Sequence, residues 1–188
     1  MLHIKTFYCN PFRECTYIIS AQEPSEIEQP CVIIDPGMYG DKEEKRVSDY
    51  LRDKHLTPVA LLITHEHPDH ICGREYIENL FPNIPVYGFN EIYKKEPIQI
   101  AGLTFKMLHT PGHKEDSICY YLENEELIFT GDTLFQESIG RTDLPGGNME
   151  ELLQSLAQLK QLPENTQVFP GHGFPTSIAH EKQYNPYM

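Results

Sequence analysis

The sequence is poor in several features that identify common classes of protein. It has five cysteines and no Cys-x-x-Cys pair, which argues against a disulfide framework and against a thiolate metal site. No apolar run approaches the roughly 20 residues that a membrane span requires. The first residues, MLHIKTFYCNPF, lack the charged start and apolar stretch of a signal peptide. We therefore expect a cytoplasmic protein.

Basic residues are also scarce. Lys and Arg number 15 against 28 Asp and Glu, which gives a formal net charge of −13. A surface of this charge repels nucleic acid and anionic lipid, so neither nucleic acid nor a membrane is an expected partner. A serine nucleophile is disfavoured as well, because the chain contains no Gly-x-Ser-x-Gly elbow.

The residues that are present describe one α/β domain. The 188 residues suffice for a sizeable core, and no linker or break in composition divides them, so we predict a single domain over residues 1–188. Segments rich in β-branched and aromatic residues are predicted as strands at 2–8, 16–20, 31–35, 59–63, 103–108, 117–122 and 126–131. Apolar stripes at helical spacing predict helices at 41–55 and 148–162, the second with an Asn cap. Strands in runs, rather than in strict alternation with helices, favour sheets covered by outer helices.

The stretch THEHPDH concentrates histidines and carboxylates directly after the apolar run VALLI. A polar surface turn is one explanation, and a metal site is the other. On a tight turn after a strand, His65 and His67 would point the same way, and Asp69 and His70 would follow the backbone to a neighbouring position. Neutral imidazoles and ionised carboxylates that converge in this way are ligands of first-row metals. Glu66 lies between the two histidines and is expected to face away.

Three more candidate ligands follow later strands. The stretches TFKMLHTPGH and TQVFPGH both end in Pro-Gly-His, and glycine permits a sharp turn that would present His113 and His172 at strand ends. A chance pair of turns is the alternative. Asp132, in FTGDTLF, lies in a similar turn. Each of these residues alone is more readily structural, but together with the first motif they supply the six or seven nitrogen and oxygen donors of a metal pair.

THEHPDH, TPGH, GDTLF and FPGHG, in this order, resemble the motifs of the metallo-β-lactamase superfamily. The match is closest to its glyoxalase II-like (hydroxyacylglutathione hydrolase-like) branch, and it continues through NPFRECTYII, IDPG, GRTDLPGG and the terminal NPY. The resemblance implies a four-layer αββα sandwich of the metallo-β-lactamase type. It also implies a short form, because the longer glyoxalase II enzymes carry a C-terminal helical domain and this sequence ends at Met188, soon after His172.

The same resemblance implies a ligand set. By position, His65, His67 and His113 would hold a first metal ion, Asp69, His70 and His172 a second, and Asp132 would bridge both. Two divalent ions are implied, with zinc as the first expectation and iron or manganese as alternatives. Asp35 resembles the carboxylate that orients such ligands, and a simple turn-former before Pro-Gly is an equally good explanation. The remaining histidines match no ligand position: His3, His55, His109 and His180.

The implied reaction is hydrolysis of small acyl thioesters such as S-lactoylglutathione. A metal-bridging hydroxide would attack the carbonyl, with Asp69 and Asp132 as catalytic residues. Two divalent ions, two aspartates and a hydroxide sum to a charge of about +1, and this positive pocket suits a small anionic acyl-thioester substrate. We expect a monomer or a small homo-oligomer.

Other interpretations stay open. Persulfide dioxygenases share HxHxDH and GRTD-like stretches but use one iron and oxygen, so metal identity and oxygen uptake would separate them. A full ligand set weighs against a non-catalytic relative, and the acidity and short length weigh against an RNA-processing one.

Arg141 and Asp143 either brace their loop or contact substrate. The KEDS turn after His113 either alters substrate choice or decorates the surface, and Cys72 is expected to be a small buried residue.

Overall fold

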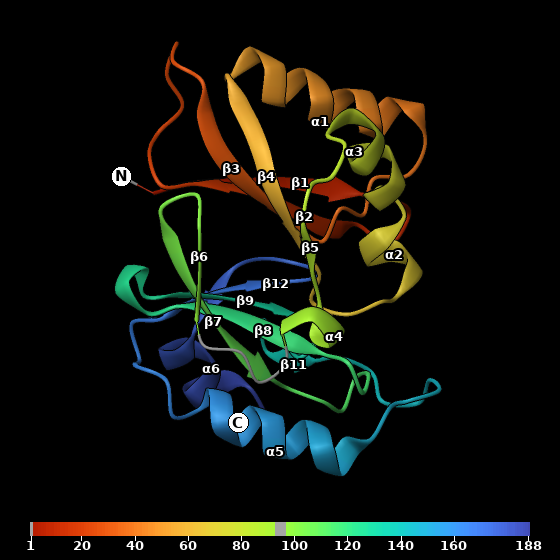
Figure 1. Cartoon of the computed structure of the whole chain (residues 1–188). Coiled ribbons are helices and arrows are strands. Elements are labelled where there is room, and N and C mark those ends of the chain that lie inside the picture. Colours follow the sequence, from red (N-terminus) through yellow and green to blue (C-terminus); the bar gives the residue numbers. More distant parts are fainter. Residues whose placement is uncertain (1, 93–96) are drawn as a thin grey trace.

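Two β-sheets stacked face to face form the centre of the fold (Figure 1). The computed structural model describes residues 2–92 and 97–188. The first sheet follows chain order: β1 (His3–Cys9), β2 (Glu14–Ser20), β3 (Gln29–Ile34), β4 (Leu56–Leu62) and β5 (Val86–Tyr87). β1, β2 and β3 pair antiparallel, whereas β3, β4 and β5 run parallel.

The second sheet has the order β13-β12-β9-β8-β7-β6. Its strands are β6 (Ile98–Ile100), β7 (Leu103–His109), β8 (Ile118–Leu122), β9 (Leu127–Gly131), β12 (Gln167–Pro170) and β13 (Thr176–Ser177). β12 runs parallel to β9, and β7 has the same direction because both β7 and β9 are antiparallel to β8. A separate hairpin follows β9 and consists of β10 (Leu134–Phe135) and β11 (Ser138–Ile139).

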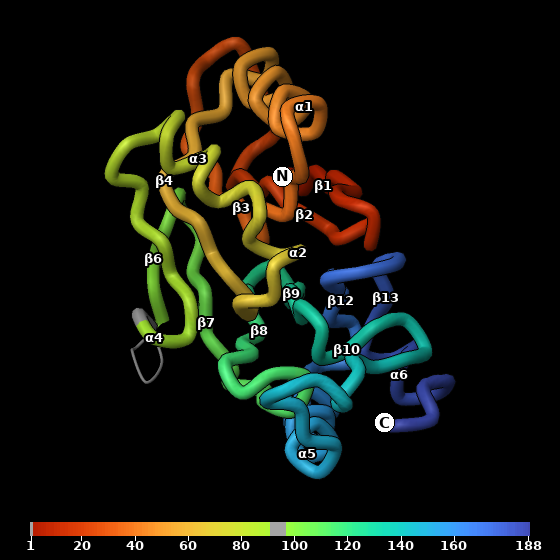
Figure 2. The backbone as a smooth tube through the Cα atoms, turned by 90° about the vertical axis from the view of Figure 1, so that its right-hand side faces the viewer, coloured from red at the N-terminus to blue at the C-terminus, as the bar shows by residue number. Residues whose placement is uncertain are grey.

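Helices cover the outer face of each sheet, which gives four layers (Figures 1 and 2). The first sheet is covered by α1 (Asp41–Asp53) and α3 (Arg74–Leu80), and the second by α5 (Met149–Leu159) and α6 (Ile178–Tyr184). The short elements are α2 (Pro68–Ile71), α4 (Phe89–Ile92) and the 3-10 turn η1 (Glu123–Glu125). The predicted four-layer αββα sandwich is confirmed. Within residues 2–92 and 97–188, the helices are too short or too polar to cross a membrane.

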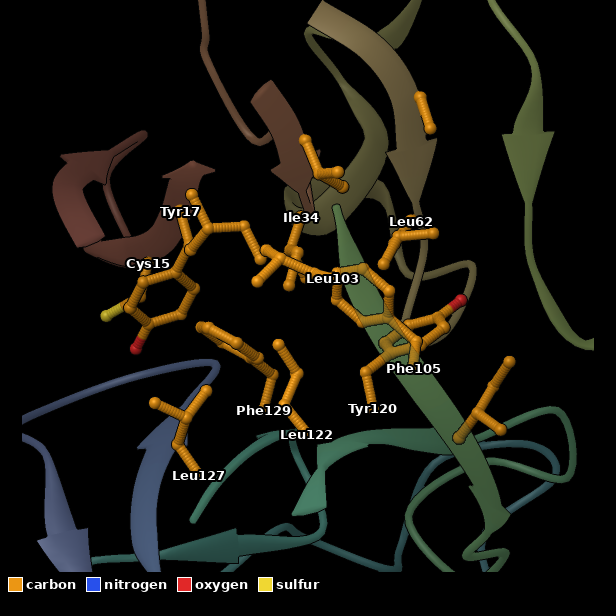
Figure 3. Packing of buried hydrophobic residues seen from close by; sticks show 14 residues of the cluster. Cys15, Tyr17, Ile34, Leu62, Leu103, Phe105, Tyr120, Leu122, Leu127 and Phe129 are labelled. Atoms are coloured by element: carbon orange, nitrogen blue, oxygen red, sulfur yellow. The ribbon is translucent and has the colours of Figure 1, made fainter. Parts of the chain in front are cut away.

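Three apolar clusters lie between the four layers. The central cluster joins the sheets, with Tyr17, Ile34 and Leu62 from the first facing Tyr120 and Phe129 from the second (Figure 3). The outer clusters set Val47, Leu51 and Ile77 against the first sheet, and Leu152, Leu156 and Leu159 against the second. Each helix therefore buries one stripe of side chains, as the apolar spacing of the two long helices predicts.

The predicted strands and both predicted helices are present, with shifted ends. The strand predicted at 59–63 begins earlier, at Leu56, and the helix predicted at 41–55 ends at Asp53. The Asn cap is confirmed, because the Asn148 side chain accepts hydrogen bonds from two backbone N–H groups of the first turn of α5. Helices α3 and α6 are not predicted, since seven residues are too few to show a helical period. The single domain, the cytoplasmic location and the oligomeric state stay predictions.

One buried hydroxyl connects the sheets close to the HxHxDH stretch. Tyr120 on β8 is fully buried, and its O–H lies 2.9 Å from the carbonyl oxygen of Ile63 and 2.8 Å from that of Tyr87. Ile63 ends the apolar run that leads into the histidines. The cross-sheet contact therefore fixes the start of that loop.

We predict that Tyr120→Phe lowers the free energy of unfolding by about 1–3 kcal/mol. The substitution keeps the packing of the ring and removes the donor from the buried carbonyl group of Ile63 and the half-buried one of Tyr87. Urea denaturation of both proteins measures the difference. Tyr121→Phe, which removes a hydroxyl from the outer face of the same strand, is the control, and an equal loss in both variants would contradict the prediction.

Candidate metal centre

Strand β4 delivers four of the candidate ligands in one stretch of chain. His65 and His67 follow the strand, and His67 has extended backbone angles because Pro68 comes next. Proline suits the first position of a helix, so α2 begins at Pro68 and turns Asp69 and His70 back toward the histidines that precede them. This sharp change from extended chain to helix explains how so short a sequence supplies members of two groups of candidate ligands.

The first group consists of His65, His67 and His113, whose ligating atoms lie within 4.8 Å of one another. His67 Nδ1 lies 3.1 Å from His65 Nε2 and 2.9 Å from His113 Nε2. Three imidazoles whose nitrogens face one point cannot all satisfy each other by hydrogen bonding. Tetrahedral zinc with bonds of about 2.0–2.1 Å places its ligands roughly 3.4 Å apart, so the spacing is close to that of a metal-binding triad.

The second group consists of Asp69, His70 and His172. His172 Nε2 lies 3.3 Å from Asp69 Oδ2, and His70 Nε2 lies 3.9 Å from the same oxygen. Asp132 stands between the groups: one carboxylate oxygen is 3.3 Å from His70 Nε2, and the other is 3.5 Å from His113 Nε2. The structure thus brings together all seven residues that the resemblance implies.

Two buried atoms of this centre have unused bonding capacity. Within the described part of the chain, His70 Nε2 and Asp132 Oδ1 are buried and have no hydrogen-bond partner. Gly171 lies against them, and a Cβ at this position would stand 2.3 Å from Asp132 Oδ1 and 2.7 Å from His70 Cε1. His70 Nε2 and Asp132 Oδ1 face each other at 3.3 Å without a hydrogen bond. A nitrogen and a carboxylate oxygen in this arrangement, beside a residue without a side chain, fit a bound cation.

Backbone carbonyls orient two of the histidines. His113 Nδ1 lies 2.7 Å from the carbonyl oxygen of Arg141, and His172 Nδ1 lies 3.1 Å from that of Phe12. A carbonyl can only accept, so each Nδ1 carries a proton, and in the neutral imidazole each Nε2 then has the lone pair that a metal ion would bind. The loops that contain Phe12 and Arg141 are therefore coupled to the ligands.

Asp35 performs the same task with a carboxylate. It accepts hydrogen bonds from the backbone N–H and the hydroxyl of Thr64 at 2.7 and 2.6 Å, and its Oδ2 lies 3.0 Å from His70 Nδ1. Thr64 Oγ1 in turn lies 3.1 Å from His65 Nδ1. Asp35 also has a positive φ of 49° and forms a turn. It is therefore both a carboxylate that orients a histidine and a turn-former before Pro-Gly, the two explanations that the sequence offers.

Burial and neighbouring charges shift the pKa values of these groups. Burial, together with the neighbouring histidines, lowers the pKa of His65 well below its usual value. Burial also opposes protonation of His70, but the carboxylates of Asp132 and Asp35 outweigh it and raise its pKa well above the usual value. For Asp69, burial is overcome by the hydrogen bond with His172, which lowers its pKa to about 2. Ionised carboxylates thus attract positive charge to the point where the two groups meet.

Two residues beside the centre are missing from the sequence prediction. Glu14 is fully buried on β2, and one of its oxygens could share a cation with Asp35 and His70. Burial raises its pKa well above the usual value, and the charge of Asp35 adds to the effect. Asn10 donates hydrogen bonds to the carbonyl oxygens of Gly37 and Asp69. In the sequence, the one feature that could have indicated these residues is the charged Glu14 close to the apolar stretch TYII.

Several other expectations can be compared with the structure. Cys72 is exposed, so the expectation of a small buried residue is wrong. The residue follows the last turn of α2, and its thiol lies 3.1 Å from the carbonyl oxygen of Gly37. Glu66 is exposed and faces away, as expected. His109 lies 2.9 Å from the carbonyl oxygen of Glu115 and packs on Phe89. Within the described residues, the candidate ligand groups do not include His3, His55, His109 or His180.

The two loops with undecided roles are both held by ion pairs. Arg141 donates two hydrogen bonds of 2.7 Å to Asp143, the geometry of a pair that braces its loop. In the KEDS turn, Lys114 pairs with Asp116 at 2.8 Å, and Asp116 accepts a hydrogen bond from the backbone N–H of Glu66. The KEDS turn is therefore bonded to the loop that carries His65 and His67.

A cavity of about 480 Å³ opens onto the centre. Its lining combines candidate ligands with apolar and charged residues: Phe12, His67, Pro68, Asp69, His113, Asp132, Arg141, Leu144 and His172. This volume is within the range of small-molecule sites, about 300–1,000 Å³. The cavity can admit a small substrate to the point where the ligand groups meet.

Comparison with protein families gives one match over most of the chain. The profile of the Metallo-beta-lactamase superfamily matches residues 25–98 and 90–172. The probable metallo-hydrolase YqgX of Bacillus subtilis (strain 168) is 36% identical, over 86% of this chain and 88% of its own length. A hydroxyacylglutathione hydrolase of Hamiltonella defensa is also 36% identical, over 81% of this chain and 61% of its own length.

Solved structures agree with the fold. The BLEG-1 B3 metallo-beta-lactamase has a TM-score of 0.89 and 31% identity, over 98% of this chain and 99% of its own. ETHE1 from Myxococcus xanthus has a TM-score of 0.83 and 31% identity, over 98% and 83%. TTHA1623 in a di-iron-bound form has a TM-score of 0.78 and 29% identity, over 98% and 100%.

We predict that Gly171→Ala lowers the number of bound divalent ions by about one per chain. The added Cβ would enter the space beside His70 and Asp132. Metal content after dialysis, measured by plasma mass spectrometry, gives the number. Gly173→Ala is the control: it has a positive φ of 86° but open space around its Cβ position, so it carries backbone strain without the clash. Equal metal content in the two variants would refute the prediction.

Proposed function

Because the chain belongs to the metallo-beta-lactamase superfamily, we propose that it is a metal-dependent hydrolase of small acyl thioesters, with S-lactoylglutathione-like substrates. The observation that carries this proposal is the convergence of two His/Asp groups on the carboxylate of Asp132. The similarity to a hydroxyacylglutathione hydrolase supports the glyoxalase II-like branch, while the similarity to YqgX supports only a metallo-hydrolase.

The residues would divide between two divalent ions. We assign His65, His67 and His113 to the first ion, Asp69, His70 and His172 to the second, and Asp132 to both. The unpartnered His70 Nε2 and Asp132 Oδ1 support this assignment. Nitrogen and oxygen donors of this kind suit zinc, iron or manganese; we propose zinc, and the di-iron form of TTHA1623 makes iron the first alternative.

Bound divalent ions would supply a Lewis acid and lower the pKa of water to about 7. The chain's own residues would then position the reactants. Asp69 has a lowered pKa and lines the cavity, so its carboxylate can accept a hydrogen bond from a water molecule and direct the oxygen toward a carbonyl carbon. Asp132 keeps both ligand groups at a fixed separation. These two aspartates are the proposed catalytic residues.

We predict that metal-loaded protein hydrolyses S-D-lactoylglutathione and that Asp132→Ala lowers kcat/KM at least about 100-fold, the order of loss when one electrostatic contributor to a transition state is removed. Absorbance of the thioester measures the rate. Asp53→Ala, which removes an exposed carboxylate at the end of α1 and outside the cavity, is the control for loss of charge. Unchanged turnover in Asp132→Ala would contradict the assignment of Asp132.

A second candidate is a persulfide dioxygenase-like oxidoreductase with one iron, an alternative that the likeness to ETHE1 fits. Oxygen consumption by iron-loaded protein with glutathione persulfide tests it. Oxygen uptake without thioester hydrolysis would replace the hydrolase proposal, and hydrolysis without oxygen uptake would remove the dioxygenase.

A further inference from the structure

An exposed phenylalanine stands at the mouth of the metal cavity. Phe12 has 71% of its surface exposed, yet it lines the same cavity as the candidate ligands, together with the uncharged side chains of Pro68 and Leu144. Scattered apolar residues on a surface need no explanation. Phe12 differs from them because its ring lies beside other apolar groups, next to a reactive centre.

The backbone that carries Phe12 is rigidly attached to that centre. The carbonyl oxygen of Phe12 accepts the hydrogen bond from His172 Nδ1. Asn10, two residues earlier, donates to the carbonyl oxygens of Gly37 and Asp69 at 2.9 and 2.8 Å, and its side-chain oxygen accepts from the backbone N–H of Phe12. The turn between β1 and β2 is thus bonded to both sides of the second ligand group. The backbone that carries the ring is held in place before any ligand arrives, which lowers the entropy cost of a contact at this position.

Charge recognition outside the metal centre is weak. Within the described residues, Arg141 is the basic side chain that lines the cavity, and both of its hydrogen bonds to Asp143 measure 2.7 Å. The Asp143 carboxylate neutralises the guanidinium and takes two of its N–H donors in a bidentate pair. The part of a substrate that extends away from the centre therefore meets mainly Phe12, Pro68 and Leu144.

We propose that Phe12 is a specificity-determining residue that selects thioesters with an apolar group next to the reacting bond. The inference rests on the proposed thioesterase function and names its substrate class. The apolar group can belong to the acyl side or to the thiol side of the thioester, because both lie within one small cavity. A phenyl group is the appropriate probe, since aromatic rings gain from stacked or edge-to-face contact with phenylalanine.

Three thioesters separate the two sides. S-acetyl-N-acetylcysteamine carries no phenyl group, S-phenylacetyl-N-acetylcysteamine carries one on the acyl side, and the acetyl thioester of 2-phenylethanethiol carries one on the thiol side. The values of kcat/KM are measured for wild-type protein, Phe12→Ala and Phe12→Leu. The intrinsic reactivity of each thioester cancels when the variants are compared on the same substrate.

Phe12→Ala is expected to lower kcat/KM about tenfold more for one phenyl-bearing thioester than for the plain one, as the loss of one apolar contact does. Phe12→Leu should recover part of this difference. Ile27→Ala, which removes a similarly exposed apolar side chain outside the cavity, should change no ratio. If Phe12→Ala binds the same number of ions and loses all three activities equally, Phe12 has no role in selection and the inference is overturned.

A binding measurement keeps the inference separate from the proposed reaction. Calorimetry compares phenylacetate with acetate on metal-loaded protein, where no turnover is needed. Phenylacetate is expected to bind about tenfold more tightly than acetate, and Phe12→Ala should abolish this preference. If no thioester is hydrolysed but the preference is present, the thioesterase proposal fails and the apolar contact stands. Equal binding of both acids by the wild-type protein overturns the contact itself.

Discussion

The carboxylate of Asp132 lies between two groups of histidines, and much of the structure serves to hold it there. One oxygen faces His70 and the other faces His113 and His172. A buried carboxylate of this kind is costly unless positive charge or hydrogen bonds compensate it. The surrounding imidazoles provide part of that compensation, and a bound cation would provide the rest. The stability of Asp132 in its position after β9 therefore depends on the histidines that follow neighbouring strands at the same edge of the sheets.

The two sheets supply those neighbours from different directions. β4 leads into the loop of His65 and His67, β7 into the turn of His113, and β12 into the turn of His172. A hydrogen-bonding partner orients the outer nitrogen of each of these histidines. Asp35 lies next to His70 Nδ1, and Thr64 lies next to His65 Nδ1. The carbonyl oxygens of Arg141 and Phe12 do the same for His113 and His172. These partners are bonded to the outer nitrogens, so the inner nitrogens stay directed at the centre. Ligands placed on rigid strand ends in this way need little rearrangement to bind a metal.

Most of the fold can be predicted from the sequence, because apolar runs and turn residues are local signals. Histidine spacing and Pro-Gly turns also mark the seven candidate ligands, but their division between two metal ions comes from the resemblance to the superfamily. THEHPDH contains four ligands in seven residues, and Pro68 alone accounts for the bend between them. The groups that hold the ligands in place are harder to predict. Asn10 and Phe12 act through backbone groups or on residues about 60 and 160 positions away, and no local pattern records such contacts. The exposure of Cys72 is also hard to predict. It depends on where α2 ends, and a helix of four residues is too short to show a helical period in the sequence.

The number and position of the bound metal ions test this account most directly. Crystals of protein loaded with zinc, with anomalous diffraction recorded at the zinc absorption edge, locate each ion without reference to any activity. The account predicts two peaks, one among His65, His67 and His113 and one among Asp69, His70 and His172, with Asp132 in contact with both. A single peak, or a second peak that does not contact Asp132, would contradict it.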